Sequence, residues 1–433
     1  MKRILAIEVK EYIGKEVLLQ GWVHRIRQLG QVSFIILRDR SGIVQTVAEE
    51  GVVAFPGLSN ESIVIIRGKV SADARAPGGV EVRVRDIDIL SQALDTPPIE
   101  INKKIDLLKT NLDTLLTFRA VCLRNPDILS IFKVQAELIR AFRQFLIQEN
   151  FTEIHTPKIV ATGTEGGAEL FSVRYFEQNV YLAQSPQFYK QIMVGSGLER
   201  VFEVGHAYRA EDHNTTRHLN EYVSLDLEMG FIENEQDVIE LQKKLIQFMF
   251  TEVSSNCAAE LKLYKVKTPQ FKDIPQLTLI EAKEILRSKC NKDLKEAPDL
   301  DPEGERLLCQ YIKKNTGEGL VYITSYPISK RPFYTMPRED NPEVSRSFDL
   351  LYDGEEITTG GQRIHNYGQL IKKMKEAGLN EKDFDFYLQA FKYGMPPHGG
   401  LAIGTERITK QLLGLGNIRE ASLFPRDRTR VAP

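Results

Sequence analysis

Hydrophobic positions in residues 1–92 fall in short runs, and some of these runs alternate with polar positions. In residues 80–85 valine alternates with glutamate or arginine, which is the period-two pattern of a half-buried strand. Runs of this kind predict strands near residues 17–23, 34–37, 43–47, 63–67 and 80–85. About five short strands in such a short stretch are typical of an OB-fold barrel, which binds oligonucleotides. A generic small β-barrel fits the same pattern.

The pattern changes after residue 92. Residues 93–127 contain Thr96-Pro97-Pro98 and are interpreted as a linker or hinge. From residue 128 an apolar stripe at helical spacing runs to Gln148 and predicts a packed helix. Strand-like and helix-like segments then alternate irregularly, as in a mostly antiparallel α+β domain over residues 128–433. Residues 256–319 are rich in lysine and glutamate, and we interpret them as a peripheral insertion of mixed structure.

The composition of the chain excludes several classes of protein. The formal net charge is −2 at pH 7, so nucleic-acid binding requires local basic patches rather than bulk charge. The four cysteines are scattered without a CxxC pair, which indicates neither a zinc site nor a disulfide framework and suits a reducing cytoplasm. The first residues have no long apolar core, so no signal peptide is expected. No apolar run approaches membrane-spanning length, so no membrane partner is expected.

A charged hairpin is the first candidate for chemistry. An apolar run from Phe202 leads to Arg209 and Glu211, and the polar loop that follows ends in Arg217 and His218. Alternate strand residues face the same side, so Arg209 and Glu211 point into one site. Arginine binds phosphate or carboxylate through two parallel hydrogen bonds, and a nearby glutamate accepts from an amino group. Such a site suits a nucleoside triphosphate, with a solvated charged hairpin as the alternative.

Several further segments carry a resemblance to a known family. Residues Gly399 to Arg407 form a glycine-rich strand that runs into a helix, and glycines there let a ligand approach the backbone. With the hairpin and the run Glu153 to Pro157, they resemble the three signature motifs of class II aminoacyl-tRNA synthetases, in family order. The segments Thr164 to Gly167, Gln184 to Gln191 and Gly360 to Arg363 are similar to the aspartate pocket of aspartyl-tRNA synthetases of archaeal and eukaryotic type.

The resemblance covers nearly the whole chain and implies a fold and an activity. The fold is α+β, with an OB-fold anticodon-binding barrel over residues 1–92. A class II catalytic domain, built on a mostly antiparallel sheet with flanking helices, covers residues 128–433. The activity is formation of aspartyl-adenylate from L-aspartate and ATP with Mg²⁺, followed by transfer of aspartate to tRNA(Asp). A cytoplasmic homodimer is implied, because Pro157 matches the motif-1 proline at the subunit interface of this class.

The resemblance also implies roles in the nucleotide site. Arg209 holds the α-phosphate and the reacting carboxylate, and Glu211 reads the adenine amino group. Arg217 and His218 lie near the outer phosphates, and Arg407 stacks on adenine and reaches the γ-phosphate. Arg209 and Arg407 are the residues expected to be catalytic. The implied ATP-binding residues are Arg209, Glu211, Arg217, His218, Tyr222, Glu356, Gly404 and Arg407.

A metal site is implied by Asp349, Glu356 and Thr359. Oxygen ligands of this kind suit Mg²⁺. The chain departs from the family here, because the hydroxyl ligand is usually a serine and is Thr359 in this chain. A glutamate that is common two residues after the aspartate is Leu351. A solvated acidic loop is the alternative.

The amino-acid pocket is implied by a second charged set. Arg363 pairs with the side-chain carboxylate of aspartate, Lys190 lies beside it, and Asp226 holds Lys190. The neutral amide of asparagine would leave one cation short of a partner, which is costly in a buried site. The residues implied to hold the ammonium end of the substrate are Glu165, Gln184 and Gln187.

In the barrel, the resemblance implies anticodon contacts from Phe34, Gln45 and Arg27. A ring that stacks on an unpaired base and an amide that reads a base edge are typical of single-stranded RNA recognition. His24 stands where relatives that discriminate between tRNAs tend to carry tryptophan, and Pro77 lies in a loop expected near the first anticodon base. This pair resembles relaxed enzymes that charge both tRNA(Asp) and tRNA(Asn). A surface histidine and a turn proline are the alternative.

Three other functions stay open at this point. An asparaginyl-tRNA synthetase shares the fold, although its Ser-Pro-Gln-x-x-Lys segment is usually altered. An asparagine synthetase on the same catalytic fold would lack the N-terminal barrel. A non-catalytic RNA-binding regulator would have no need to keep Arg209, Glu211, Glu356 and Arg407.

Overall fold

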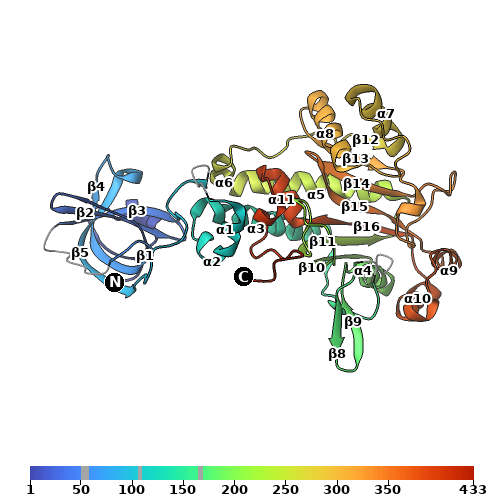
Figure 1. Ribbon diagram of the computed structural model, residues 1–433, viewed down its shortest axis with the longest axis horizontal. Coiled ribbons are helices and arrows are strands. Elements are labelled where there is room, and N and C mark those ends of the chain that lie inside the picture. Colours follow the sequence, from blue (N-terminus) through green and yellow to red (C-terminus); the bar gives the residue numbers. More distant parts are fainter. Residues whose placement is uncertain (50–57, 106–109, 164–168) are drawn as a thin grey trace. The chain divides into compact units, whose positions relative to one another are not determined.

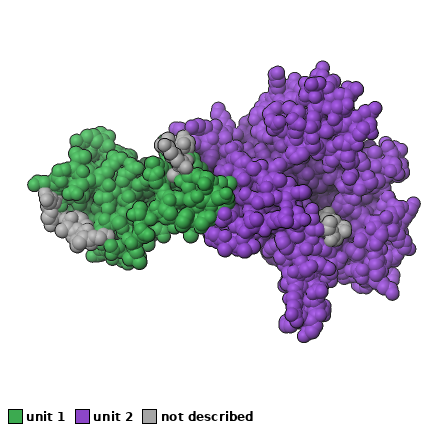
Figure 2. All heavy atoms as spheres, viewed as in Figure 1, with its two compact units in different colours: residues 1–128 green, residues 129–433 purple. Residues whose placement is uncertain are grey.

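The chain folds into two compact units, residues 1–128 and residues 129–433 (Figure 2). The computed structural model describes residues 1–49, 58–105, 110–163 and 169–433. The segment 93–127, interpreted from sequence as a linker, contains the short helices α1 (Leu112–Thr117) and α2 (Arg119–Cys122). Ile99, Ile101 and Cys122 in this segment form a small buried apolar cluster with Ile128. The segment is therefore folded structure within the first unit.

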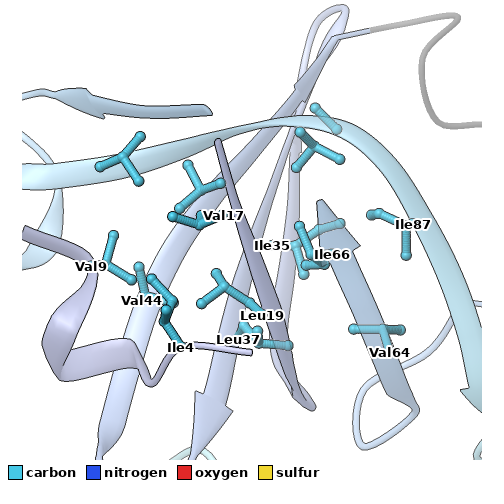
Figure 3. Close-up of a cluster of buried hydrophobic side chains, with 14 of the residues drawn as sticks. Ile4, Val9, Val17, Leu19, Ile35, Leu37, Val44, Val64, Ile66 and Ile87 are labelled. Atoms are coloured by element: carbon cyan, nitrogen blue, oxygen red, sulfur yellow. The ribbon is translucent and has the colours of Figure 1, made fainter. Parts of the chain in front are cut away.

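The first unit contains a closed barrel with the strand order β1-β2-β3-β5-β4 within the described residues. All neighbouring strands pair antiparallel except β3 and β5, which pair parallel. Alternate valine, leucine and isoleucine side chains point inward and pack together (Figure 3), as the period of two requires. The predicted OB-fold barrel is confirmed. Its strands are β1 (Glu16–Leu29), β2 (Val32–Asp39), β3 (Gly42–Glu49), β4 (Ile63–Ala72) and β5 (Val80–Ser91).

The second unit is built on a sheet with the order β12-β13-β14-β15-β16-β11-β10-β6 within the described residues (Figure 1). The pairs β12–β13 and β10–β6 are parallel and the others antiparallel, so the predicted α+β class is confirmed. The strands are β6 (Thr152–Glu153), β10 (Arg200–Tyr208), β11 (Glu221–Gly230), β12 (Gln276–Thr278), β13 (Leu320–Thr324), β14 (Ser347–Tyr352), β15 (Glu355–Arg363) and β16 (His398–Gly404). A smaller sheet has the order β7 (Ile159–Val160), β9 (Gln178–Leu182), β8 (Ser172–Tyr175).

The two faces of the large sheet differ, because one packs against a helix and the other lines a pocket. Thr358 of β15 accepts a buried hydrogen bond of 2.8 Å from Gln242 of helix α5, whereas its neighbour Thr359 lines a pocket. Successive strand residues face opposite sides, so α5 packs behind the pocket floor. Within the described residues the helices of this unit are α3 (Pro126–Gln148, which begins in the first unit), α4 (Gln187–Met193), α5 (Glu235–Asn256), α6 (Ala258–Leu263), α7 (Leu279–Cys290), α8 (Pro302–Thr316), α9 (Tyr367–Glu376), α10 (Asp385–Lys392) and α11 (Thr405–Leu413).

Residues 256–319 contribute more to the sheet than a peripheral insertion would. They supply the edge strand β12, and α7 and α8 bury Leu286, Leu308 and Ile312 against β13. Asp301 caps α8 by accepting from the Gly304 amide at 2.7 Å, which fixes where the helix begins. Among the described residues, no helix is both long and apolar enough to cross a membrane.

Candidate active site

A pocket lies over the sheet where the β10–β11 hairpin meets β15, β16 and α11. Its lining includes all eight residues expected to bind ATP. Glu406, whose carboxylate accepts from the Val223 amide at 3.1 Å, ties α11 to β11 beneath it. Burial raises the pKa of Glu406 to about 8. The lining residues are Arg209, Glu211, Arg217, His218, Leu219, Tyr222, Ser224, Glu356, Ile357, Thr359, Ala402, Gly404, Glu406, Arg407 and Ile418.

The hairpin places Arg209 in the wall of this pocket. Arg209 follows the last residue of β10, and its amide donates to the Asn220 carbonyl at 2.9 Å, which continues the β10–β11 ladder. Its guanidinium lies 5.9 Å from the ring centroid of Tyr222 on β11, within the range of a cation–π contact. Glu211 lies 3.3 Å from His218, at the end of the same loop. Arg209 and Glu211 therefore line one site, as the sequence predicts.

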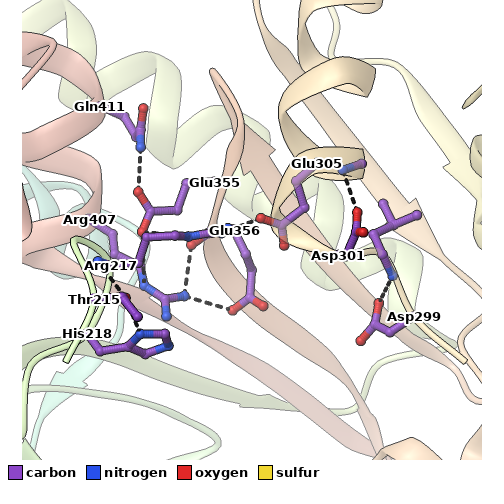
Figure 4. A network of polar contacts seen from close by, with 12 residues as sticks. Thr215, Arg217, His218, Asp299, Asp301, Glu305, Glu355, Glu356, Arg407 and Gln411 are labelled. Carbon is purple, nitrogen blue, oxygen red and sulfur yellow. Dashed lines mark hydrogen bonds and ion pairs between the residues drawn. The ribbon is translucent and has the colours of Figure 1, made fainter. Parts of the chain in front are cut away.

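The other two arginines of the pocket lie among carboxylates (Figure 4). Arg407 of α11 donates to the Glu356 carbonyl at 3.0 Å and lies 3.4 Å from its carboxylate. Arg217 bonds to Glu305 of α8 and lies 3.4 Å from Glu355. Lys410 neutralises Glu355 at 2.6 Å. Arginines paired in this way can exchange a carboxylate for a phosphate. The carboxylate is planar and the phosphate tetrahedral, but each can accept two parallel hydrogen bonds from a guanidinium.

A second pocket adjoins the first and shares part of its wall. Its lining includes Lys190, Asp226 and Arg363, which are residues expected to select the amino acid. The two pockets have in common Arg209, Tyr222, Ser224, Glu356, Thr359 and Ala402. Arg209 thus faces both pockets, which is where a group that holds two reacting partners has to lie.

The second pocket contains a buried group of two cations and two carboxylates. The Lys190 ammonium lies 3.1 Å from Asp226 and 3.3 Å from Glu228, and Arg363 donates to Glu228 at 3.0 Å. The side chains of Lys190 and Asp226 are each 2% exposed, and that of Glu228 is fully buried. Burial raises the pKa of Glu228, but Arg363 and Lys190 more than offset this, so the pKa of Glu228 is below its ordinary value. The carboxylate of Glu228 is therefore stabilised in its charged form by its two cationic neighbours.

The Lys190 ammonium is held among oxygen acceptors of the protein. Its three N–H groups lie within hydrogen-bond distance of Asp226 and of the carbonyls of Leu227 and Leu401, at 3.1–3.3 Å. Asp226 also accepts from Ser224 at 2.6 Å. Arg363 donates to the Gly400 carbonyl at 3.1 Å. The cations are held in place before any substrate arrives.

Glu228 has no assigned role in the sequence interpretation, although a signal for it exists. Ser224, Asp226 and Glu228 alternate along β11, and a period of two puts all three side chains on one face. Gln187 of α4 lies 3.5 Å from Arg363, and its Nε2 is buried without a hydrogen-bond partner among the described residues. Gln184 is also buried. Glu165 lies outside the described residues.

The residues expected to bind a metal supply hard oxygen atoms on two neighbouring strands. Thr359 donates to Glu356 at 2.9 Å, and Asp349 is directly opposite Thr359 across β14 and β15. One oxygen of Asp349 binds Arg331 at 2.7 Å, and the other is buried with no partner among the described residues. No described cluster of three or more His, Cys, Asp or Glu side chains is arranged to hold an ion. The set fits Mg²⁺, which is commonly held by one or two carboxylates together with substrate phosphates.

In the barrel, Arg27, Phe34 and Gln45 share the outward face of three strands. Arg27 is opposite Phe34 across β1 and β2, and Gln45 is opposite Ile36 across β2 and β3. Cross-strand diagonal neighbours such as Phe34 and Gln45 are roughly 7–8 Å apart. The Gln45 amide donates to Glu81 at 3.2 Å, so this side chain is already oriented.

His24 and Pro77 occupy different surroundings. His24 lies where the β1–β2 register shifts, and its Nδ1 accepts from Arg38 at 2.9 Å. Arg38 in turn binds Glu61 through two hydrogen bonds of 2.8 Å. Burial and Arg38 lower the pKa of His24 to about 4. The ring is therefore an anchored neutral acceptor. Pro77 is exposed at the start of the turn Pro77–Gly79.

Comparison with known proteins agrees with this geometry. Residues 111–428 match the model of the family "tRNA synthetases class II (D, K and N)", and residues 17–90 match the OB-fold nucleic acid binding domain. The chain belongs to this class II synthetase family. It is 49% identical, over the full length of both chains, to the aspartate–tRNA(Asp/Asn) ligase of Thermus thermophilus. It is 46% identical to the aspartate–tRNA(Asp) ligase of Pyrococcus abyssi, over 98% of each chain.

Solved structures share the fold with either amino-acid specificity. The asparaginyl-tRNA synthetase of Pyrococcus horikoshii complexed with asparaginyl-adenylate has a TM-score of 0.91 at 32% identity, and the match covers 100% of both chains. A putative aspartyl-tRNA synthetase of Leishmania major has a TM-score of 0.90 at 32% identity, covering 100% of this chain and 95% of the other. The fold alone does not separate aspartate from asparagine, so the pocket has to do so.

Proposed function

We propose that this enzyme, an aspartate–tRNA ligase by its family and its full-length relatives, transfers aspartate to both tRNA(Asp) and tRNA(Asn). The observation that carries the choice of amino acid is the buried group of Lys190, Asp226, Glu228 and Arg363 beside Arg209. Its two cations, Lys190 and Arg363, are fixed in a desolvated site, where their charges are little screened. The substrate side chain that suits such a site is a carboxylate.

Adenylate formation follows from the position of Arg209 at the shared wall of the two pockets. The α-carboxylate of aspartate attacks the α-phosphorus of ATP, and pyrophosphate leaves. Both partners are anionic, so Arg209 lowers the barrier by holding them together and by stabilising the charge that develops. Glu211 accepts from the adenine amino group, and Tyr222 stacks on the base. Arg407 binds the base and the outer phosphates, while Arg217 and His218 bind the outer phosphates.

Glu356, Thr359 and the free oxygen of Asp349 would hold Mg²⁺ in this scheme. When bound, the ion supplies positive charge to the phosphates. Gly404, at the start of α11, leaves room for the nucleotide because it has no side chain. Gln184, Gln187 and Glu165 bind the ammonium group of aspartate. In the second step, a hydroxyl of the terminal ribose of tRNA attacks the carbonyl of the adenylate and AMP leaves.

The choice of tRNA rests on the barrel. Phe34 stacks on the central anticodon base and the Gln45 amide, oriented by Glu81, reads its edge, with Arg27 as a third contact. These contacts are common to tRNA(Asp) and tRNA(Asn), whose anticodons differ in the third base. His24, in place of the tryptophan of discriminating relatives, and the loop shaped by Pro77 permit either base. Relatives of both kinds, for tRNA(Asp) and for tRNA(Asp/Asn), are similar to this chain.

Charging tests this proposal directly. Purified tRNA(Asp) and tRNA(Asn) are incubated with labelled aspartate, ATP and Mg²⁺, and the expected result is aspartylation of both. Replacing His24 by tryptophan together with Pro77→Lys is expected to reduce aspartylation of tRNA(Asn) by about tenfold more than that of tRNA(Asp), since one discriminating hydrogen bond is worth about 1–3 kcal/mol. An unmodified enzyme that rejects tRNA(Asn) would show that it is specific for tRNA(Asp).

The proposed assembly is a cytoplasmic homodimer. Pro157, which follows β6 of the large sheet, matches the motif-1 proline at the interface of this class, and charging of tRNA belongs to the compartment where translation occurs. Sedimentation at micromolar concentration is expected to show a dimer, and a monomer under these conditions would contradict the assignment.

A further inference from the structure

Arg217, expected to bind the outer phosphates of ATP, is already bound by a carboxylate from a distant part of the chain. Its guanidinium bonds to Glu305 and lies 3.4 Å from Glu355 (Figure 4). The side chains of Arg217 and Glu305 are 20% and 14% exposed, so the pair lies largely out of water. Desolvated pairs of this kind interact more strongly than exposed pairs.

Glu305 is held rigidly at this position. It lies in the first turn of α8, where its amide donates to the Asp301 carbonyl at 3.0 Å. Leu308, Cys309 and Ile312 of the same helix are buried against β13. The backbone of Glu305 is therefore anchored in α8, whereas Arg217 lies on the hairpin loop and has the longer side chain.

The two glutamates beside Arg217 differ in their other partners. Glu355 lies 2.6 Å from Lys410 and accepts from Gln411 at 2.5 Å, so its charge is offset without Arg217. Among the ion pairs of the described residues, Glu305 has Arg217 alone. Burial raises the pKa of Glu305 to about 7, even though Arg217 lowers it. Its negative charge thus acts mainly on Arg217 and on whatever binds there.

We propose that Glu305 is a positioning residue that weakens the hold of Arg217 on the outer phosphates and so sets how readily pyrophosphate leaves the site. The proposal rests on the ATP-binding role of this pocket. Glu305 keeps Arg217 at the mouth of the phosphate region and competes with the phosphates for its N–H groups. Release of pyrophosphate returns Arg217 to Glu305.

The test removes the charge of Glu305 and keeps its shape. Glu305→Gln retains an oxygen that accepts from Arg217, and Glu303→Gln is the matched control, since Glu303 lies on the same helix with a side chain 55% exposed. Binding of pyrophosphate and of ATP is measured at pH 8 by calorimetry, with aspartate-dependent exchange in parallel. We expect Glu305→Gln to bind pyrophosphate about three- to tenfold more tightly and to lower KM for ATP more than it changes kcat for exchange. The control should match the unmodified enzyme.

Two further measurements separate positioning from a structural role. In an Arg217→Gln background, Glu305→Gln is expected to leave the affinity for pyrophosphate unchanged, because the effect acts through Arg217. Thermal unfolding shows whether a variant has lost stability. If one has, the comparison within the Arg217→Gln background still tests whether the effect depends on Arg217. Unchanged or weaker binding of pyrophosphate by a folded Glu305→Gln protein would overturn the proposal. Failure of the unmodified enzyme to bind ATP would instead contradict the assigned function of the pocket.

Discussion

The proposed nucleotide pocket, around Arg217 and Arg407, and the proposed aspartate pocket, around Lys190 and Arg363, share a wall but hold their charges in different ways. In the aspartate pocket Lys190, Asp226, Glu228 and Arg363 are buried and bind one another on strands and a helix. In the nucleotide pocket Arg407 is 29% and Arg217 20% exposed, and both lie on carboxylates that a phosphate can replace. The pocket that has to reject the neutral amide of asparagine keeps its charged side chains bound to one another. The pocket for the phosphates keeps its arginines bound to carboxylates that a phosphate can displace.

The largest effect on activity is expected from removing one of the four buried charges beside Arg209. Arg363→Gln removes a buried cation and leaves Glu228 poorly balanced, and losing one partner of a buried pair costs about 3–5 kcal/mol. Aspartate-dependent pyrophosphate exchange is expected to fall about a thousandfold, while ATP binding, measured by calorimetry, stays within a few-fold. Arg338→Gln, at an arginine outside both pockets, is the control. A parallel loss of both properties would assign Arg363 to the nucleotide or to the fold.

Arg209→Ala tests the wall between the two pockets. In the proposed scheme the guanidinium holds both reacting groups, and one preorganised donor to developing charge is worth a factor of about 10²–10³ in rate. Exchange is expected to fall by this factor with circular dichroism unchanged. Near-normal exchange in the folded variant would refute the role given to Arg209.

Added salt is expected to affect the two pockets differently, and this effect is smaller than that of the substitutions. Exposed charges are screened at high ionic strength and buried ones much less. Between low salt and about 0.5 M KCl, KM for ATP is expected to rise several-fold, while the ratio of aspartate to asparagine activation stays constant. A selectivity ratio that falls along with ATP binding would mean that the aspartate pocket is as open to solvent as its neighbour.

How much of this arrangement the sequence predicts depends on how far apart the interacting residues lie along the chain. The barrel and the Arg209–Glu211 pair follow from local alternation, and Lys190 with Asp226 followed from motif resemblance. Glu228 was overlooked despite its period-two spacing from Asp226. Glu305 gives no local signal, because its partner Arg217 lies 88 positions away in sequence. Long-range ion pairs depend on how strands and helices pack, and neither composition nor periodicity records that.

The smallest predicted effect extends the comparison to the barrel. His24 has a pKa lowered to about 4 from an ordinary value of 6.5, so the unfolded chain binds more protons between these values. Stability of the barrel therefore falls as pH drops from 6.5 to 4. The ring is partly exposed, so we expect a loss of about 1 kcal/mol, well below the value for full burial. His24→Gln should remove this part of the pH dependence, as measured by urea unfolding of the isolated residues 1–128 if they fold alone, or of the full chain.

The central claim is that the buried charges beside Arg209 select aspartate. Pyrophosphate exchange by the unmodified enzyme, without tRNA, measures this choice with either amino acid at equal concentration. Aspartate is expected to support exchange about a hundredfold faster than asparagine or better, since the fixed charges of Lys190 and Arg363 attract a carboxylate and an amide carries no charge for them to attract. Exchange with asparagine that equals or exceeds exchange with aspartate would contradict the account.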